Sequence, residues 1–267
     1  MHRVLLKLGG LNVYSYGALL ALAFICGTLL AAMRAHKQGI DKNKIMDLSF
    51  YIAISSILGA RIMFVALNWG YYFSNPLEMV KLWEGGLVFY GGLISAFIVV
   101  VVFLARNKLP VLKVLDIFAA PLALGIAIGR IGCFLNGCCY GKISQRFGIS
   151  YPALDDPPAF AQQVTDGLIS SHAQCSLPVL PTQLYLSASC LAVFFILWRL
   201  EQNRRFPGFL FWVFILLYSL TRFIIEGMRY YEANFMLSGM SISQLISLLL
   251  MAIAILAIII GSRRARG

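Results

Sequence analysis

The chain has 267 residues, of which 60% are hydrophobic and only 12% are charged. A soluble domain carries about a quarter charged residues, so this composition excludes a soluble globule, a disordered tail and a coiled coil. The net charge of +11 suggests a nucleic-acid partner at first sight, but the positions of the basic residues give it another meaning.

Seven apolar runs are long enough to cross a bilayer as helices, which needs about 20 residues each. They are continuous rather than alternating, which favours helices over a barrel. The first run is too long for the core of a signal peptide, so we expect it to be retained. The fourth is the least regular, because Pro121 and several glycines interrupt it. The sequence therefore predicts an all-α, polytopic membrane protein, a single transmembrane domain over 1–267, with spans at 11–33, 46–67, 85–105, 112–135, 181–198, 207–227 and 240–261.

Lysine and arginine gather on one side of the predicted spans. Thirteen of the 22 lie in alternate connections and the C-terminal tail, six lie on the opposite side, and three lie inside spans. Basic residues concentrate in the cytoplasmic connections of membrane proteins, so we expect the C-terminus in the cytoplasm and the N-terminus outside. The basic charge is thus an orientation signal and does not imply nucleic acid. The three intramembrane exceptions are Arg61, Arg130 and Arg222.

The longest connection, 136–180, is polar and falls on the predicted outer side. Its length is typical of a small external cap rather than of a domain. It contains the adjacent Cys138 and Cys139 as well as Cys175. On an oxidising face we expect one of the adjacent pair to form a structural disulfide with Cys175. No metal site is expected, because four suitable ligands are not evident, and a covalent cysteine intermediate stays open.

Each predicted span places a polar residue near its outer end. Buried ionisable groups in membranes are costly and usually face a cavity or a partner, so three arginines and one glutamate at one depth predict an anion site open to the outer leaflet. Two structural alternatives stay open: Arg222 and Glu226, spaced i and i+4, neutralise each other, and Arg61 extends to the headgroups. The residues of this outer layer are Tyr16, Arg61, Tyr90, Arg130, Gln183, Arg222, Glu226 and Gln244.

Glycines supply a second signal. Close helix packing explains many small residues in membrane spans, but the run 129–141 also contains Arg130, Asn136 and two adjacent cysteines, and it ends a helix at the outer surface. Free backbone N–H groups beside an arginine would form a phosphate cradle there.

Residues 129–141 read GRIGCFLNGCCYG and resemble the signature of the bacterial phosphatidylglycerol–prolipoprotein diacylglyceryl transferase family. Further matches fall in the family's order and cover the whole chain. None of these motifs is specific alone, but the set is. They are Tyr16-Gly17, Gly59-Ala60-Arg61, Gly91-Gly92-Leu93-Ile94, Pro181-Thr182-Gln183-Leu184-Tyr185, Arg222-Phe223-Ile224-Ile225-Glu226 and Ser243-Gln244.

The resemblance implies a transferase of the bacterial inner membrane with its active site towards the outer leaflet. Its partners would be phosphatidylglycerol, whose diacylglyceryl group moves, and prolipoprotein signal peptides, whose lipobox cysteine becomes a thioether as glycerol 1-phosphate leaves. It implies no metal and no soluble cofactor. By residue match, Arg130 and Arg222 hold the phosphate, and Glu226 orients Arg222. The implied substrate-binding residues are Tyr16, Arg61, Asn136, Gly141, Gln183 and Glu226.

Three positions depart from the family's pattern. Tyr90 stands where the family has a histidine proposed as the base for the thiol, Cys133 replaces an asparagine, and Cys138 replaces an acidic residue. We count Tyr90 with the catalytic residues, but a phenol with a pKa near 10 is normally protonated at neutral pH. Tyr90 is therefore expected to donate a hydrogen bond to the phosphate or ester, with the base elsewhere or local positive charge lowering the pKa of the thiol. A relative with lapsed activity or altered specificity stays open, whereas an anion transporter fits less well because the polar layer is one-sided.

Overall fold

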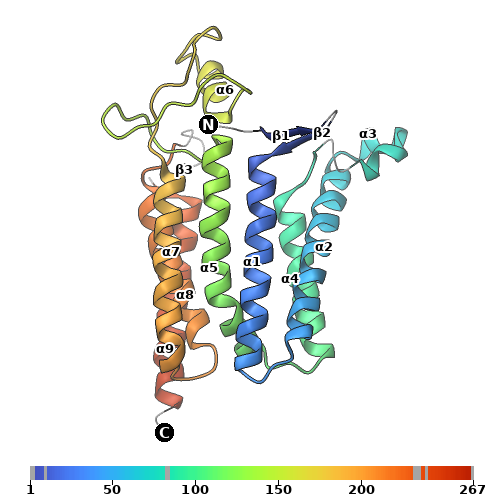
Figure 1. Ribbon diagram of the computed structural model, residues 1–267, viewed down its shortest axis with the longest axis vertical. Helices are drawn as coiled ribbons and strands as arrows, with labels where there is room; N and C mark the ends of the chain where they lie inside the picture. The colour runs from blue at the N-terminus through green and yellow to red at the C-terminus, as the bar shows by residue number, and fades with distance from the viewer. Residues whose placement is uncertain (1–3, 9–10, 82–84, 231–235, 238–239, 266–267) are drawn as a thin grey trace. The chain divides into compact units, whose positions relative to one another are not determined.

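The computed structural model describes residues 4–8, 11–81, 85–230, 236–237 and 240–265. Within these ranges, seven helices are long and apolar enough to cross a membrane (Figure 1). The predicted number and order of spans are confirmed. The helices are α1 (Ser15–Lys37), α2 (Lys42–Leu67), α4 (Phe89–Arg106), α5 (Val111–Asn136), α7 (Thr182–Leu200), α8 (Phe209–Glu226) and α9 (Ile242–Arg264).

Shorter elements occupy the connections. Residues 11–14, expected at the start of the first span, instead form a strand that pairs with the strand before it. A second antiparallel pair precedes α9. The shorter elements are β1 (Val4–Leu8), β2 (Leu11–Tyr14), α3 (Trp69–Ser74), the 3₁₀ helix η1 (Pro76–Val80), α6 (Pro158–Thr165), the 3₁₀ helix η3 (Glu201–Asn203), β3 (Met236–Leu237) and β4 (Met240–Ser241).

Helix α5 differs from the irregular span that was expected, because it runs without a break through Pro121. Proline is tolerated inside membrane helices, where neighbouring helices and local adjustments satisfy the backbone group that it leaves unbonded. The helix therefore continues to Asn136, and this extension decides where the segment after it begins.

Buried polar groups at two helix ends have structural partners. Asp116 in α5 accepts hydrogen bonds from the backbone N–H groups of Gly208 at 2.7 Å and Phe211 at 2.9 Å, so it caps the start of α8. Ser241 and Gln244 form a reciprocal capping box at the start of α9. Gln244, expected in the polar layer, thus has a helix-capping role.

Contacts divide the chain into two compact units. Unit 1 comprises Met1–Gly27 and Leu115–Gly267, and unit 2 comprises Thr28–Val114. The single transmembrane domain expected from the sequence stays a prediction.

In unit 2, α2 packs closely against α4 at glycines. A Cβ atom on Gly59 would lie 2.6 Å from the carbonyl oxygen of Gly91, and one on Gly92 would lie 2.9 Å from that of Ser56. Both distances are too short for a real side chain, so only glycine permits this approach of the two backbones. The paired glycines of the third predicted span therefore have a packing role.

In unit 1, α8 packs against α7 and α9. Ala127, Leu186, Cys190 and Ile225 form a buried apolar cluster that joins α5, α7 and α8. Ser187 Oγ donates a hydrogen bond to the carbonyl oxygen of Ala127 at 2.8 Å and so ties α7 to α5. These contacts fix the helix ends that carry the polar residues.

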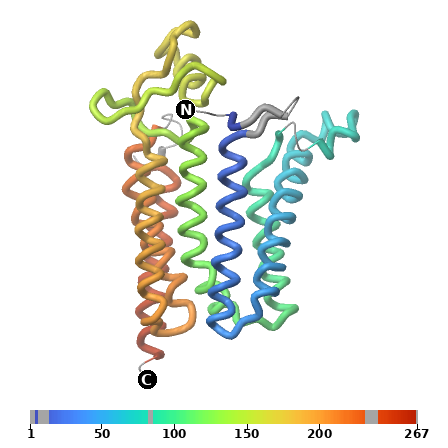
Figure 2. The backbone as a smooth tube through the Cα atoms, in the orientation of Figure 1, coloured from blue at the N-terminus to red at the C-terminus, as the bar shows by residue number. Residues whose placement is uncertain are grey.

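The connection between α5 and α7 forms a cap at one end of these helices, with α9 ending at the opposite end of the unit (Figures 1 and 2). The cap contains α6 and a small core of Tyr151, Ala159 and Val179. Ile149 and Val179 exchange backbone hydrogen bonds at 2.9 and 3.1 Å. The cap thus has packing and pairing of its own above the helix ends.

Candidate active site

Polar side chains from several segments of unit 1 meet around one carboxylate at the cap end. Glu226, the last residue of α8, has a fully buried side chain. Its Oε2 lies 2.9 Å from Nη2 of Arg222 and 3.5 Å from Nη1 of Arg229. Its Oε1 accepts a hydrogen bond from Oγ of Ser241 at 3.4 Å. Glu226 thus joins α8, the segment after it and the residue that begins α9, and it has the geometry to orient Arg222.

Arg229 was not predicted as a site residue. Its side chain is 16% exposed, the same as that of Arg222, and it shares the same carboxylate. A signal was available, because Arg222, Glu226 and Arg229 have the spacing of residues on one helix face. The segment after α8 begins at Gly227, and Arg229 continues that face beyond the end of the helix.

Arg130 lies on α5 and is half-buried. Its guanidinium interacts with Cys133, Cys139 and Tyr218. It has no carboxylate partner among the described residues. Cys139 also interacts with Arg229, so it connects Arg130 to the group around Glu226. Among the described residues of this group, Arg222 and Arg229 share the Glu226 carboxylate and Arg130 adjoins them through Cys139.

The chain turns sharply after α5. Gly137 has φ +75° and Cys139 has φ +61°, and a left-handed residue other than glycine costs about 1 to 2 kcal/mol. Contacts from the first turn of α7 offset this cost: Gln183 Nε2 donates to the Cys138 carbonyl oxygen at 2.7 Å, and Thr182 Oγ1 donates to the Cys139 carbonyl oxygen at 3.0 Å. The start of α7 thus fixes the conformation of residues 137–141.

Three backbone N–H groups of the predicted phosphate cradle are already hydrogen-bonded within the protein, and for the rest of the run the cradle stays a prediction. The N–H groups of Gly137 and Cys138 donate to carbonyl oxygens in the last turn of α5, and that of Gly141 donates to Leu180 O at 2.9 Å. The physical reason is that α5 extends to Asn136 and the residues after it pair with the cap. The guanidinium groups of Arg130, Arg222 and Arg229 supply positive charge beside this run.

Gly141 lies where three segments converge. A Cβ atom there would lie 2.7 Å from both Met228 O and Thr182 Cγ2. Glycine is required because any side chain would force the start of α7 away from the segment after α8. The contact of Gly141 with a headgroup stays a prediction.

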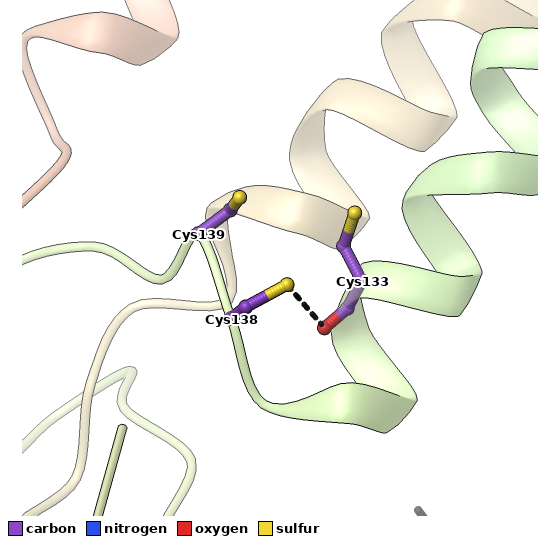
Figure 3. A group of neighbouring side chains, drawn as sticks. All are labelled: Cys133, Cys138 and Cys139. Atoms are coloured by element: carbon purple, nitrogen blue, oxygen red, sulfur yellow. Dashed lines mark hydrogen bonds between the residues drawn. The ribbon is translucent and has the colours of Figure 1, made fainter. Parts of the chain in front are cut away.

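Three cysteine sulfur atoms gather beside Arg130. Those of Cys133, Cys138 and Cys139 all lie within 4.8 Å of one another. Figure 3 shows Cys133 on α5 and the other two on the turn after it, with the Cys138 thiol directed at the Cys133 carbonyl oxygen, 3.7 Å away. Hydrogen bonds from the other two thiols, together with Arg229 and Arg130, lower the pKa of Cys139.

The disulfide expected between Cys175 and one of the adjacent cysteines is not formed. All three are free thiols, and Cys175 is exposed in the cap, where it pairs through a backbone bridge with Pro152. The turn after α5 instead directs Cys138 and Cys139 back towards Cys133. The left-handed residue Cys139 is the cause, and the sequence pattern does not specify it.

Three further predicted residues lie around the sulfur atoms. Gln183 is buried and also donates to the hydroxyl of Tyr151 at 3.3 Å. Asn136 interacts with the Cys138 thiol. Tyr16 in α1 interacts with Arg130, and a Cβ atom on Gly132 would lie 3.4 Å from the Tyr16 ring. Unit 1 thus brings Tyr16, Arg130, Asn136, Gly141, Gln183, Arg222 and Glu226 to one end.

Arg61 and Tyr90 belong to unit 2. Arg61 is buried, and its guanidinium donates to four backbone carbonyl oxygens, those of Glu78 at 2.6 Å, Met79 and Gly85 at 2.8 Å, and Gly86 at 3.2 Å. It therefore organises the connection between α2 and α4. Tyr90 is 68% exposed and forms no hydrogen bond with another described residue.

Comparisons with known proteins agree with these motifs. A family profile described as Prolipoprotein diacylglyceryl transferase matches residues 3–260. The chain belongs to this family. It is 34% identical over 271 residues to the phosphatidylglycerol–prolipoprotein diacylglyceryl transferase of Pediococcus pentosaceus, with all of this chain and 93% of the relative covered. The corresponding protein of Clostridium perfringens, named transferase 2, is 31% identical, with 100% of this chain and 98% of the relative covered. That of Listeria innocua is 34% identical, with 94% of this chain and 87% of the relative covered.

As a member of the prolipoprotein diacylglyceryl transferase family, the chain has an unusual donor set. The three-sulfur group includes Cys133 and Cys138, two of the positions at which it departs from the family's sequence pattern. Next to it stands a cationic group, fixed by a buried carboxylate, that can bind an anion.

Proposed function

We propose that this chain transfers the diacylglyceryl group of phosphatidylglycerol to a cysteine thiol of a prolipoprotein, forming a thioether and releasing glycerol 1-phosphate. The observation that carries the proposal is the pair of Arg222 and Arg229 on the buried carboxylate of Glu226, with Arg130 connected to them through Cys139. The names of the relatives support the reaction class and both substrates.

Charge develops on the phosphate when its bond to the glyceryl carbon breaks. Guanidinium groups fixed before the reaction stabilise that charge, and each such donor is worth about 3 kcal/mol. Arg222 is held by Glu226 at 2.9 Å, so it does not reorganise when the phosphate arrives. Arg130 has no carboxylate partner among the described residues and is the guanidinium most available to the anion.

The residues around the cationic group are proposed to position the substrates. Tyr16, Asn136, Gly141 and Gln183 surround the cationic group and are proposed to border the lipid headgroup. Arg61 is omitted from the headgroup contacts because its donors already meet four carbonyl oxygens. The basic residues of the sequence support an inner-membrane location with the cap end outside, where the lipobox cysteine of a signal peptide would arrive.

The test uses the purified full chain in detergent with phosphatidylglycerol and a lipobox peptide. We expect the peptide mass to rise by one diacylglyceryl group, with no change for a peptide whose cysteine is replaced by serine. Arg130→Ala should abolish the product while leaving membrane insertion intact. Complementation of a strain depleted of its own transferase checks the same reaction in cells. No product and no complementation would instead indicate a relative that binds lipid or lipoprotein without transfer.

A further inference from the structure

The three clustered thiols have the spacing of a metal-ligand set. Zinc binds cysteine sulfur at about 2.3 Å, which in a tetrahedral site places sulfur atoms about 3.8 Å apart. The sulfur atoms of Cys133, Cys138 and Cys139 already lie within 4.8 Å of one another, so small side-chain rotations close the set. Soft thiolate ligands select zinc over calcium or magnesium.

Charged and polar side chains stand around the three sulfur atoms that a metal would bind. Cys139 interacts with Arg130 and Arg229, which compensate negative charge on sulfur. Asn136 interacts with the Cys138 sulfur, in the place of an outer-shell residue of a metal site. Gln183 and Thr182, the latter through the Cys139 carbonyl oxygen, fix the turn that carries two of the sulfur atoms. Residues outside the three-sulfur group thus fix the positions of the proposed ligands.

Three protein ligands leave one tetrahedral position for a substrate. No fourth histidine, cysteine or carboxylate among the described residues joins the three-sulfur group. The proposed reaction has a thiol as its nucleophile, and a thiol near pKa 8.5 needs help to ionise. Coordination to a metal deprotonates a thiol outright.

We propose that Cys133, Cys138 and Cys139 bind one zinc ion, and that its fourth position takes the thiol of the substrate cysteine. The second half of this proposal rests on the proposed function. The thiol proton passes to solvent when the sulfur binds zinc. The sulfur then bonds to the glyceryl carbon as the bond from that carbon to the phosphate oxygen breaks, and the electron pair leaves with glycerol phosphate. Nothing is oxidised or reduced.

The first experiment measures metal binding without activity. The full chain, purified in detergent under reducing conditions, is loaded with zinc, dialysed and analysed for metal. We expect about one zinc per chain, and cobalt(II) in its place should show sulfur-to-metal charge-transfer absorption. Wild-type protein that keeps free thiols but no zinc, or whose cluster contains a disulfide by mass spectrometry under these conditions, overturns the site.

Variants identify the ligands. Cys133→Ser and Cys139→Ser should each lose most of the zinc, whereas Cys175→Ser, which removes an exposed thiol of the cap, should keep it. The double variant Cys133→Asn/Cys138→Glu restores the residues of the family's pattern, so it is expected to fold and to bind no zinc, with thermal unfolding as the check. Zinc retained by that variant would place the metal elsewhere.

The second experiment tests the open position. A lipobox peptide added to the cobalt form should change the charge-transfer spectrum, and the matched serine peptide should not. An unchanged spectrum contradicts thiol binding at the metal. The thioether assay on the same samples separates the two proposals. Product from metal-free enzyme refutes the role of zinc in catalysis but supports diacylglyceryl transfer. Bound zinc without any product refutes the transfer but supports the zinc site.

Discussion

Two regions of the molecule bury arginine in opposite ways. In unit 2, the Arg61 guanidinium meets four backbone carbonyl oxygens and lies over the rings of Phe64 and Tyr72, 5.6 and 5.4 Å from their centroids. In unit 1, Arg222 and Arg229 share one carboxylate, and Arg130 adjoins thiols. The carbonyl oxygens use nearly all of the donors of Arg61, because arginine has five N–H groups. In unit 1, Arg130 has no carboxylate partner among the described residues and can therefore meet an anion.

The comparison shows that depth along a predicted span does not distinguish the two roles. In the sequence, both kinds of arginine are cations inside an apolar run, where burial of the charge costs free energy. What separates them is the partner: backbone carbonyls hold a connection in place, whereas a shared carboxylate fixes a charged side chain and leaves it able to bind a phosphate. Substitutions at each arginine should therefore affect different measurements.

Replacing Arg130 should give the largest effect on catalysis. Arg130→Ala removes the guanidinium without a carboxylate partner, and we expect kcat to fall about 1,000-fold, as for the loss of a donor that stabilises transition-state charge. Arg130→Lys keeps the charge but not the planar donor geometry and should recover only part of the rate. Thioether formation from phosphatidylglycerol and a lipobox peptide measures both. A kcat for Arg130→Ala within about threefold of wild type would remove Arg130 from the mechanism.

Replacing Glu226 should lower activity by about 100-fold and also reduce stability, because breaking a buried ion pair costs about 3 kcal/mol. Glu226→Gln keeps the shape of the side chain but leaves Arg222 and Arg229 without their shared negative charge. Thermal unfolding in detergent and kcat are measured together. A variant with normal stability and normal kcat would show that Glu226 does not orient Arg222.

How much could be predicted from the sequence depends on the physical constraint behind each feature. A bilayer demands long apolar runs, so the number and order of the spans followed from composition along the chain. Cys133 and Cys139 converge only because the chain turns through left-handed residues at Gly137 and Cys139, and no residue pattern requires a cysteine there. The carbonyl partners of Arg61 belong to an irregular connection, whose path depends on tertiary contacts rather than on periodicity.

Replacing Arg61 should reduce stability rather than catalysis. Arg61→Ala removes a buried guanidinium together with its four hydrogen bonds, and we expect the free energy of unfolding to fall by about 2 kcal/mol. Arg61→Lys should recover little of this stability, since one ammonium group cannot reach all four carbonyl oxygens that Arg61 binds. The KM for phosphatidylglycerol should not change at temperatures where the variant is folded. A raised KM with unchanged unfolding would return Arg61 to the headgroup site.

Replacing Tyr90 should have the smallest effect and sharpens the contrast between fixed charge and a lone hydroxyl. Tyr90→Phe keeps the ring, whose neighbour Phe89 lies 5.9 Å away between centroids, and removes only a hydroxyl with no hydrogen bond to a described residue. Because this hydroxyl has no partner among the described residues, we expect kcat/KM to fall by about threefold at most. The pH dependence of kcat/KM between pH 6 and pH 9, measured for both proteins, should be unchanged within error. A loss as large as that of Arg130→Ala, or a missing limb in the pH profile, would give Tyr90 a role in proton transfer and would leave no need for a metal to ionise the thiol.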